Sequence, residues 1–557
     1  MTPPDPRRWV TLAVVVVAAL IVVLDNSVLT VAIPTILRDF HTTLPAVEWV
    51  ITGYALTFAS LLIIGGRLAD VFGERRIFVI GAALFGGGSL LAALSWNVPS
   101  LIVGEAIIEG IGASMMLPTT LSIISTTFHG RERATAFGAW GATVGAGAAL
   151  GPVVGGFLTT NYTWRWAFGI NVIVAPLAIV GALVFVRRDR PTTHRVSIDV
   201  PGACLVATGL FLFVFALSQG ARYGWFRPLG RFDIAGTTVW PDVGVSFIPV
   251  VMLVAIGVLC AFYKLERWKE RHDRSPLFEF GQLRHRGFRY GLVTTSVLAM
   301  GQMGMFFVLP VFLQDAKHLT AETNGFWMLP FGVCIIIGSQ LGGYLTRFLG
   351  VARVVQLGLV LEFIGLVTVA FVVDPSMSFV DLLVPYGLFG FGIGFASSQL
   401  TNVILSDIPP DKSGVASGAN STVRQVGAAL GVAVIGSVFA SLTVSKTLDA
   451  VRSSRLSSAL RETAVHGVRA QGASFPVPRG APAADAAALT HALSTGITEA
   501  VRPALLLAAG FVVVGAFLSL LLPRTPPVAG EPEPFVERLV ALEPMEPDPA
   551  AVLSREP

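Results

Sequence analysis

Three acidic side chains stand inside stretches of sequence that are otherwise apolar. Asp25 follows the run VTLAVVVVAALIVVL, and Glu105 and Glu109 lie within LIVGEAIIEG. A carboxylate at the centre of a lipid bilayer costs roughly 2.5–3.5 kcal/mol, so each acid should face a cavity or a polar partner. Four residues make just over one helical turn, so Glu105 and Glu109 share a helix face and could share one proton. Because burial favours the neutral carboxyl group, the three acids are candidates for reversible proton binding.

Each position also has a structural alternative. Asp25, which precedes Asn26, could be a hydrogen-bonded acid that only stabilises its helix. Either glutamate could pair with Arg165 or with another buried base. The hypothesis carried forward is that the three acids line a cavity and exchange protons for a substrate of cationic character.

The composition identifies the kind of element that must position these acids. Of 557 residues, 53% are hydrophobic and only 13% are charged, whereas soluble globular proteins have roughly 25% charged residues. Many apolar runs of about 20 residues are long enough to cross a bilayer as helices, and they lack the alternation of barrel strands. The chain is therefore predicted to be an all-α integral membrane protein. The net charge of +4 reflects the loops and does not indicate a nucleic-acid partner.

Apolar runs separated by charged or Pro/Gly-rich breaks predict fourteen spans. Their expected limits are 11–36, 48–69, 77–95, 100–124, 134–158, 166–186, 200–218, 244–263, 289–313, 324–346, 353–373, 379–404, 414–441 and 502–522. Both termini then lie on one side of the membrane. With that side cytoplasmic, the inner segments hold more than twice as many Lys and Arg residues as the outer ones, in line with the positive-inside rule.

An internal repeat divides the chain. The turns GRLADVFGERR (66–76) and GYLTRFLGVAR (343–353) share a glycine, a leucine two places on and a second glycine seven places on. These turns are equivalent only if two six-span halves flank an inserted pair of spans, an arrangement typical of secondary transporters. The predicted segments are an N-terminus (1–9), a first bundle (10–187), an inserted pair with a basic loop (188–288), a second bundle (289–522) that includes an outer loop (442–501), and a disordered tail (523–557).

These sequences resemble the major facilitator superfamily, specifically its fourteen-span branch of drug:proton antiporters. GRLADVFGERR matches the cytoplasmic turn signature, and LDNSVLTVAIP (24–34) is similar to the first-span signature of that branch. The antiporter signature of span five is matched at Gly138, Gly147, Gly151, Pro152, Gly155 and Gly156. The resemblance implies a major facilitator fold that exports drugs on the proton gradient, with no other cofactor and no metal. It also implies a monomer, which we expect in a bacterial plasma membrane with both termini cytoplasmic.

The resemblance implies a role for each signature. The turn formed by Gly66, Asp70, Gly73, Arg75 and Arg76 would act as an inner gate, with Asp70 facing the two arginines. A plain topological turn with a surface ion pair is the alternative. The span-five glycines and proline would form a hinge and a seal against leak, and static helix packing is the alternative. One departure stands out, because antiporters of this superfamily usually present an arginine where this chain has Glu105.

Further polar residues at helical spacing are candidates for the substrate cavity. Asn26 and Met116 belong to the spans of the acids, and the second half contributes Gln399, Asn402, Asn420 and Arg424. Polar stripes within spans usually face the bundle interior. Arg424 is a candidate for the missing internal cation, or it holds helices together. Glu362 is a further candidate acid.

Other classes of function fit less well. No GxxxxGK[ST] loop is present, and the histidines lie in loops or at span ends without HExxH spacing. The favoured function is export of small amphipathic molecules, drugs or antibiotics, in exchange for protons. Export of a lipid or glycolipid is the alternative, for which the outer loop 442–501 would provide a landing or exit feature. A membrane-embedded enzyme is a remote third possibility.

Overall fold

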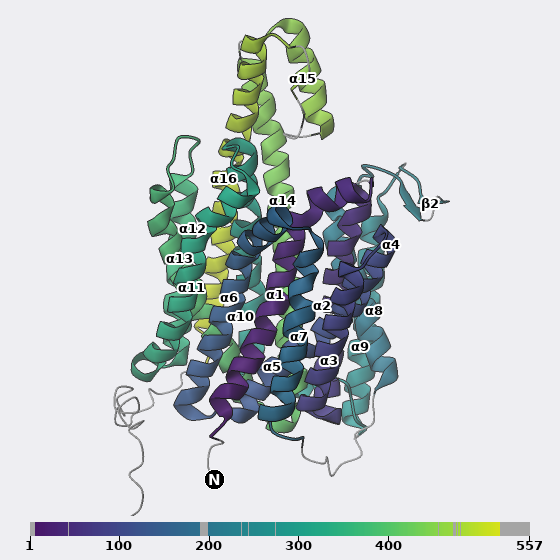
Figure 1. The fold of residues 1–557 in the computed structure, drawn as a ribbon, viewed down its shortest axis with the longest axis vertical. Coiled ribbons are helices and arrows are strands. Elements are labelled where there is room, and N and C mark those ends of the chain that lie inside the picture. Colours follow the sequence, from purple (N-terminus) through teal and green to yellow (C-terminus); the bar gives the residue numbers. More distant parts are fainter. Residues whose placement is uncertain are drawn as a thin grey trace, which may run out of the picture.

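The chain folds into long helices that run side by side (Figure 1). This computed structural model describes residues 6–42, 44–189, 199–234, 237–242, 244–272, 274–454, 456–471, 475, 477–478 and 481–523. Most of the predicted tail, from residue 524 onward, lies outside these described residues.

The first half contains six membrane-crossing segments, one of which is built from three consecutive helical pieces. The elements are α1 (Arg8–Asp39), α2 (Leu44–Phe72), α3 (Glu74–Ala93), α4 (Val98–Leu101), the π-helix η1 (Ile102–Glu109), α5 (Gly110–Thr127), α6 (Gly130–Asn161) and α7 (Arg165–Phe185).

An inserted pair and a second half follow. The insertion consists of α8 (Val200–Tyr223), an antiparallel hairpin of β1 (Phe232–Ile234) and β2 (Thr237–Trp240) with Phe232 opposite Trp240, and α9 (Phe247–Arg271). The second half consists of η2 (Phe280–Arg284), α10 (Arg286–Val311), η3 (Phe312–Ala316), α11 (Ala321–Leu349), α12 (Val351–Val372), η4 (Val380–Leu382), α13 (Leu383–Ser406), η5 (Pro410–Lys412), α14 (Ser413–Ser453), α15 (Ser458–Gln471) and α16 (Ala483–Ser519).

The predicted fold class is confirmed. Thirteen segments of the described residues are long and apolar enough to cross a membrane. The remaining predicted span corresponds to α6, a 32-residue helix that packs against α1 and α11. Two predicted limits fall short of the helices, because α14 continues to Ser453 and α16 already begins at Ala483. Hydropathy marks the edge of the bilayer, whereas these helices extend beyond it.

The internal repeat is visible in the backbone. Gly73 precedes α3 with φ +101°, and Gly350 precedes α12 with φ +79°. Both glycines therefore adopt left-handed backbone conformations that other residues rarely tolerate. The same glycine-dependent turn joins the second and third spans of each half, as the paired sequence motifs predict.

Contacts between the halves run along α2 with α14 and along α6 with α11, and α8 packs on both α2 and α14. The largest apolar core extends through both halves. In Figure 1, α15 and the adjoining parts of α14 and α16 project together from one end of the molecule. The N-terminus lies at the opposite end. We call this projection, residues 442–501, the outer hairpin. It has a small apolar core of its own, formed by Val451, Leu456, Ala464, Leu489 and Ala492.

Candidate functional site

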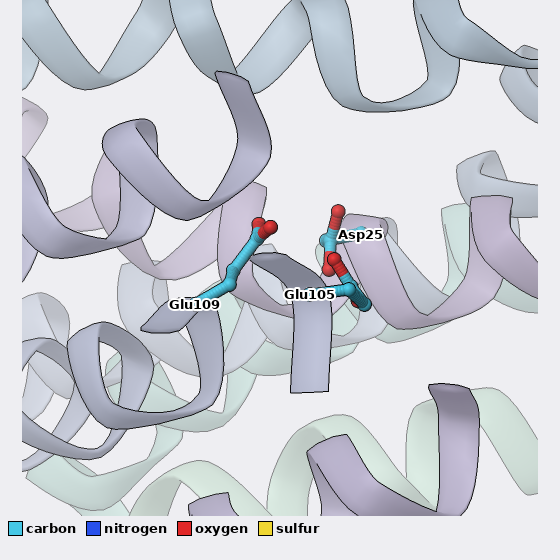
Figure 2. Close-up of side chains that lie close together, drawn as sticks. All are labelled: Asp25, Glu105 and Glu109. Atoms are coloured by element: carbon cyan, nitrogen blue, oxygen red, sulfur yellow. The ribbon is translucent and has the colours of Figure 1, made fainter. Parts of the chain in front are cut away.

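The three acids predicted to bind protons lie together in the first half. Figure 2 shows Asp25 from α1 next to Glu105 and Glu109 from η1. One carboxylate oxygen from each acid lies within 4.8 Å of the others. All three side chains are buried, with at most 1% of their surface exposed. We call this group the acid cluster.

Local helix geometry brings the two glutamates to one side. They lie in a π-helix, whose i→i+5 hydrogen bonds widen the turn and which often marks a functional site. Residues four apart therefore stay on nearly the same face. A Cβ atom placed on Gly88 of α3 would lie 2.6 Å from the backbone nitrogen of Glu109, so only glycine allows α3 to come this close.

Uncharged polar side chains from two other helices bind the acid cluster. The amide nitrogen Nδ2 of Asn171 on α7 donates to Asp25 Oδ1 at 2.6 Å and to Glu109 Oε1 at 3.1 Å. The hydroxyl of Ser89 on α3 donates to Glu109 Oε1 at 2.6 Å. The sequence analysis missed both residues. The available signal was Asn171 alone, a single amide within the apolar run WAFGINVIVAP.

The remaining oxygens of the cluster face one another. Glu105 has both Asp25 and Glu109 as neighbours within the cluster. Asp25 Oδ2, Glu109 Oε2 and both oxygens of Glu105 receive no hydrogen bond from a described donor. Ionising all three acids at once would bury adjacent negative charges without compensation. Burial without a countercharge therefore favours the neutral form of these carboxyl groups.

No described Lys or Arg side chain forms an ion pair with the acid cluster. Arg165 instead binds Asp39 Oδ2 at 2.8 Å and the carbonyl oxygen of Ser95 at 3.0 Å. The alternative that Arg165 pairs with a buried glutamate is therefore wrong. Hydrogen bonds from Trp164 and Arg165 hold the pKa of Asp39 below its usual value.

Three carboxylates at this spacing could also surround a cation. However, Asn171 and Ser89 direct hydrogen-bond donors at two of the three acids. These donors bind Asp25 Oδ1 and Glu109 Oε1, and the other oxygens of the cluster could hold either shared protons or a cation.

The signature glycines of α6 lie directly beside the acid cluster. Cβ atoms placed on Gly147 and Gly155 would lie 3.0 Å from atoms of Val23 and Val28 on α1, and one on Gly151 would collide with Ser27. These contacts flank Asp25 on both sides along α1. Gly138 meets α11, and Gly156 has open space around it. The side chain of Pro152 lies outside the described part, and α6 is helical throughout.

The signature turn joins the two halves at the end of the molecule where the N-terminus lies. The carboxylate of Asp70 accepts hydrogen bonds from the backbone nitrogens of Gly414 at 2.7 Å and Val415 at 2.8 Å. These two N–H groups belong to the first turn of α14, where they have no partner within the helix. No side chain at the N-cap position of α14 binds them. A side chain on Gly66 would collide with the carbonyl of Gly414. Nearby, Ser122 on α5 and Ser413 hydrogen-bond at 2.6 Å.

This arrangement differs from the predicted pairing of Asp70 with Arg75 and Arg76. The backbone nitrogens of the two arginines bind the carboxylate of Asp189 at 2.9 and 3.1 Å. Asp189 thus caps α3, and Asp70 is free to cap α14 across the boundary between the halves. At the N-terminus of a helix, a carboxylate accepts two charge-assisted hydrogen bonds from backbone N–H groups. An ion pair with a flexible surface arginine would stabilise the carboxylate less.

Comparisons with known proteins agree with this architecture. Residues 15–432 match the sequence model of the Major Facilitator Superfamily. The chain belongs to that superfamily. It is 32% identical over 456 residues to the probable actinorhodin transporter of Streptomyces coelicolor, covering 81% of this chain and 75% of the relative. It is 34% identical over 450 residues to a puromycin resistance protein of Streptomyces alboniger, covering 80% and 84%. The predicted resemblance to this superfamily is confirmed.

A solved structure supports the fold alone. The human organic anion transporter MFSD10 aligns with a TM-score of 0.55 and 14% identity, over 92% of this chain and all of that one. The fold is thus that of a superfamily transporter, and the site must be argued from this chain's own residues.

The predicted cavity residues of the second half lie on α13 and α14. Gln399 on α13 donates to the carbonyl of Ala134 on α6 at 3.3 Å, and Asn402 donates to Gln399 at 3.4 Å. Gln399 therefore links the two halves, and Asn402 supports it from the same helix. Asn420 on α14 is buried, and neither amide atom has a described hydrogen-bond partner.

Arg424 lies one turn beyond Asn420 on α14. It is half-buried, donates to Thr401 Oγ1 at 3.1 Å and lies 5.6 Å from the ring centroid of Trp140. It does not contact the acid cluster. Met116 is buried in the main core, and the side chain of Asn26 lies outside the described part. Cavity roles for these residues stay predictions.

Proposed function

We propose that this protein is a proton-coupled exporter of small amphipathic molecules with cationic character, including antibiotics, that works by alternating access. Its membership of the superfamily and its similarity to a probable actinorhodin transporter and a puromycin resistance protein support export of such compounds. The proton gradient is the only energy source required.

The acid cluster is the observation that carries the proposal. Three buried carboxylates contact an amide and a hydroxyl, and no described cation neutralises them. In a dry site such a group is stable only with protons bound. Water that reaches the site from one face allows proton loss, which leaves negative charge that a cationic substrate can neutralise. Proton and substrate therefore compete for one site, which is the condition for antiport.

Opening must then alternate between the two faces. With Asp70 bonded to α14, the inner ends of the halves are held together. We propose that this contact and the Ser122–Ser413 bond are the inner gate, and that both break when the cavity opens inward. The glycines of α6 pack directly on Val23, Ser27 and Val28 of α1, and we propose that this close contact couples the gate motion to the helix that carries Asp25.

The remaining assignments follow from the sequence. We propose a bacterial plasma-membrane protein with both termini cytoplasmic, which the distribution of basic residues supports. We propose that it acts as a monomer with no enzymatic activity, and that the predicted segment boundaries at 9, 187, 288 and 522 separate its parts. Arg424 would carry the internal positive charge of the cavity.

Export of a lipid or glycolipid is the second candidate function. The outer hairpin favours it, because its separate apolar core forms a projection that a small-molecule exporter does not obviously need.

Transport by inverted membrane vesicles tests the proposal. Asp25→Asn removes the ionisable group while keeping its size, so ethidium uptake driven by a pH gradient should fall to background. Asp39→Asn is the matched control on the same helix, because Asp39 is exposed at the far end of α1. The control should transport like the wild type. Ethidium uptake that survives in Asp25→Asn, with equal protein in the membrane, would refute the proton role.

A further inference from the structure

A second buried carboxylate lies in the other half of the molecule. Glu362 is near the middle of α12 and has no exposed surface. Its Oε1 accepts a hydrogen bond from Gln302 Nε2 of α10 at 2.7 Å, and the same nitrogen lies 3.3 Å from the hydroxyl of Ser397 on α13. Its Oε2 is buried and receives no hydrogen bond from a described donor.

The helices around Glu362 repeat those around the acid cluster. In order of spans, α10, α12 and α13 correspond to α1, α3 and the η1–α5 segment. A Cβ atom placed on Gly88 would lie 2.6 Å from the backbone nitrogen of Glu109, and one on Gly392 would lie 2.5 Å from that of Glu362. Each half therefore has an acid at a close contact between its third and fourth spans, and a glycine makes that contact possible. In the first half the glycine is on the third span and the acid is on the fourth. In the second half the acid is on the third span and the glycine is on the fourth.

No charged group faces Glu362 from the described residues packed around it. On α16, Arg502 donates to the carbonyl of Ala370, and on α11 Arg347 stacks on its neighbour Tyr344. The buried Tyr386 of α13 lies against Phe331, on the far side of its own helix turn. An ionised Glu362 would thus be a buried charge with a single amide donor, which is costly at this depth.

We propose that Glu362 binds a second proton, so that each half of the transporter carries one proton per cycle. Gln302, which binds the carboxyl group, and Ser397 are both half-buried. A single side chain therefore separates the carboxyl group of Glu362 from the accessible surface. The Gln302 amide donor stabilises the ionised state when the cavity opens, and burial favours the protonated state when it closes. The inference deepens the proposed function, on which its role in transport rests, but proton binding itself can be measured without transport.

Chemical modification of the wild-type protein tests proton binding. A hydrophobic carbodiimide reacts with protonated carboxyl groups: the acid proton moves to a nitrogen, the carboxylate oxygen bonds to the central carbon, and the acyl group then migrates to nitrogen. The resulting N-acylurea adds the mass of the whole reagent, so peptide mass spectrometry locates it. We expect an adduct on Glu362 at neutral pH that disappears at alkaline pH. A Glu362 that stays unmodified at every pH overturns the proposal.

Transport of ethidium, a monovalent cation, tests the number of protons. With two protons exchanged per ethidium, the cycle moves net charge and responds both to membrane potential and to a pH gradient. Glu362→Gln leaves one proton, so the response to potential should vanish while the response to the pH gradient remains. Glu322→Gln, which removes an exposed acid at the start of α11, should keep both responses. Asp25→Asn should lose both.

These outcomes separate the two hypotheses. A Glu362→Gln protein that keeps the response to potential contradicts the second proton, whatever Asp25→Asn does. An Asp25→Asn protein that still transports contradicts the proposed function, even where the carbodiimide modifies Glu362. If Glu362→Gln fails to reach the membrane, modification of the wild-type protein still decides the proposal.

Discussion

At the level of single residues, Asn171 joins acids that belong to different helices. Its Nδ2 donates to Asp25 of α1 and to Glu109 of η1. An amide keeps its donor hydrogens whether the acids are ionised or neutral, because it does not titrate. Asn171 can therefore hold the two helices together through the whole proton cycle.

Replacing Asn171 by leucine should keep the branched shape of the side chain but remove the donor. A hydrogen bond to a charged group contributes about 1.5–3 kcal/mol, so the rate of pH-driven ethidium uptake should fall roughly tenfold or more. The matched control is Ile173→Leu, because Ile173 lies two residues away on the exposed face of α7 and should transport normally. An Asn171→Leu rate equal to the wild-type rate would show that the amide is dispensable.

The sequence revealed the acids but not their partners. A carboxylate within an apolar run is costly enough to stand out, so Asp25, Glu105 and Glu109 could be selected without a structure. Ser89 could not, since small hydroxyl residues are common in membrane helices, and the lone amide of Asn171 gave no sign of which acids it binds. Which of them meets an acid depends on how the helices pack.

At the level of elements, the N-terminus of α14 depends on another helix. Its first backbone N–H groups have no local cap and bind Asp70 of α2. The negative carboxylate also complements the positive end of the helix dipole. This contact exists only while the halves are closed at their inner ends, so opening should expose both groups to water.

Asp70→Asn should therefore loosen the inner gate. An anion at a helix N-terminus is worth about 1 kcal/mol, so its loss should change the ratio of closed to open states roughly fivefold. The rate at which maleimide labels a cysteine that replaces the buried Ala416, in a protein whose native cysteines have been replaced, measures this opening. Asp411→Asn in the preceding turn is the control, because Asp411 is exposed. Equal labelling rates in the two variants would contradict the gate.

The extent of the helices was only partly predictable. Within the bilayer, charged and Pro/Gly-rich breaks located the spans, as for 77–95 against α3 (Glu74–Ala93). Beyond the bilayer, hydropathy carries no signal for a helix that continues into water. The limits of α14 and α16 were missed for that reason, and the contact of Asp70 with α14 was missed because it depends on the packing of the two halves.

At the level of the whole molecule, the two halves differ in where their charge lies. The first half contains three clustered buried acids, whereas Glu362 is the one buried acid among the described residues of the second half, and the cation Arg424 lies there on a different helix. Antiport needs a site that changes charge and a cavity that opens on alternate faces. In the proposed mechanism the acid cluster supplies the change of charge, and the close glycine contacts between α1 and α6 couple the movement of these two helices.

The outer hairpin is separate from this machinery, and its removal distinguishes the two candidate functions. Its apolar side chains form their own cluster. Among the described helices, α15 has substantial contacts only with α14. Replacing residues 452–486 with a short Gly/Ser linker should leave ethidium transport within about twofold of wild type, because the membrane core is untouched. Leu489→Asp, which buries a charge in the hairpin core, is the companion variant and should behave the same way. Loss of ethidium transport in both variants, with normal amounts in the membrane, would instead favour an exporter whose substrate must pass along the hairpin, as a lipid would.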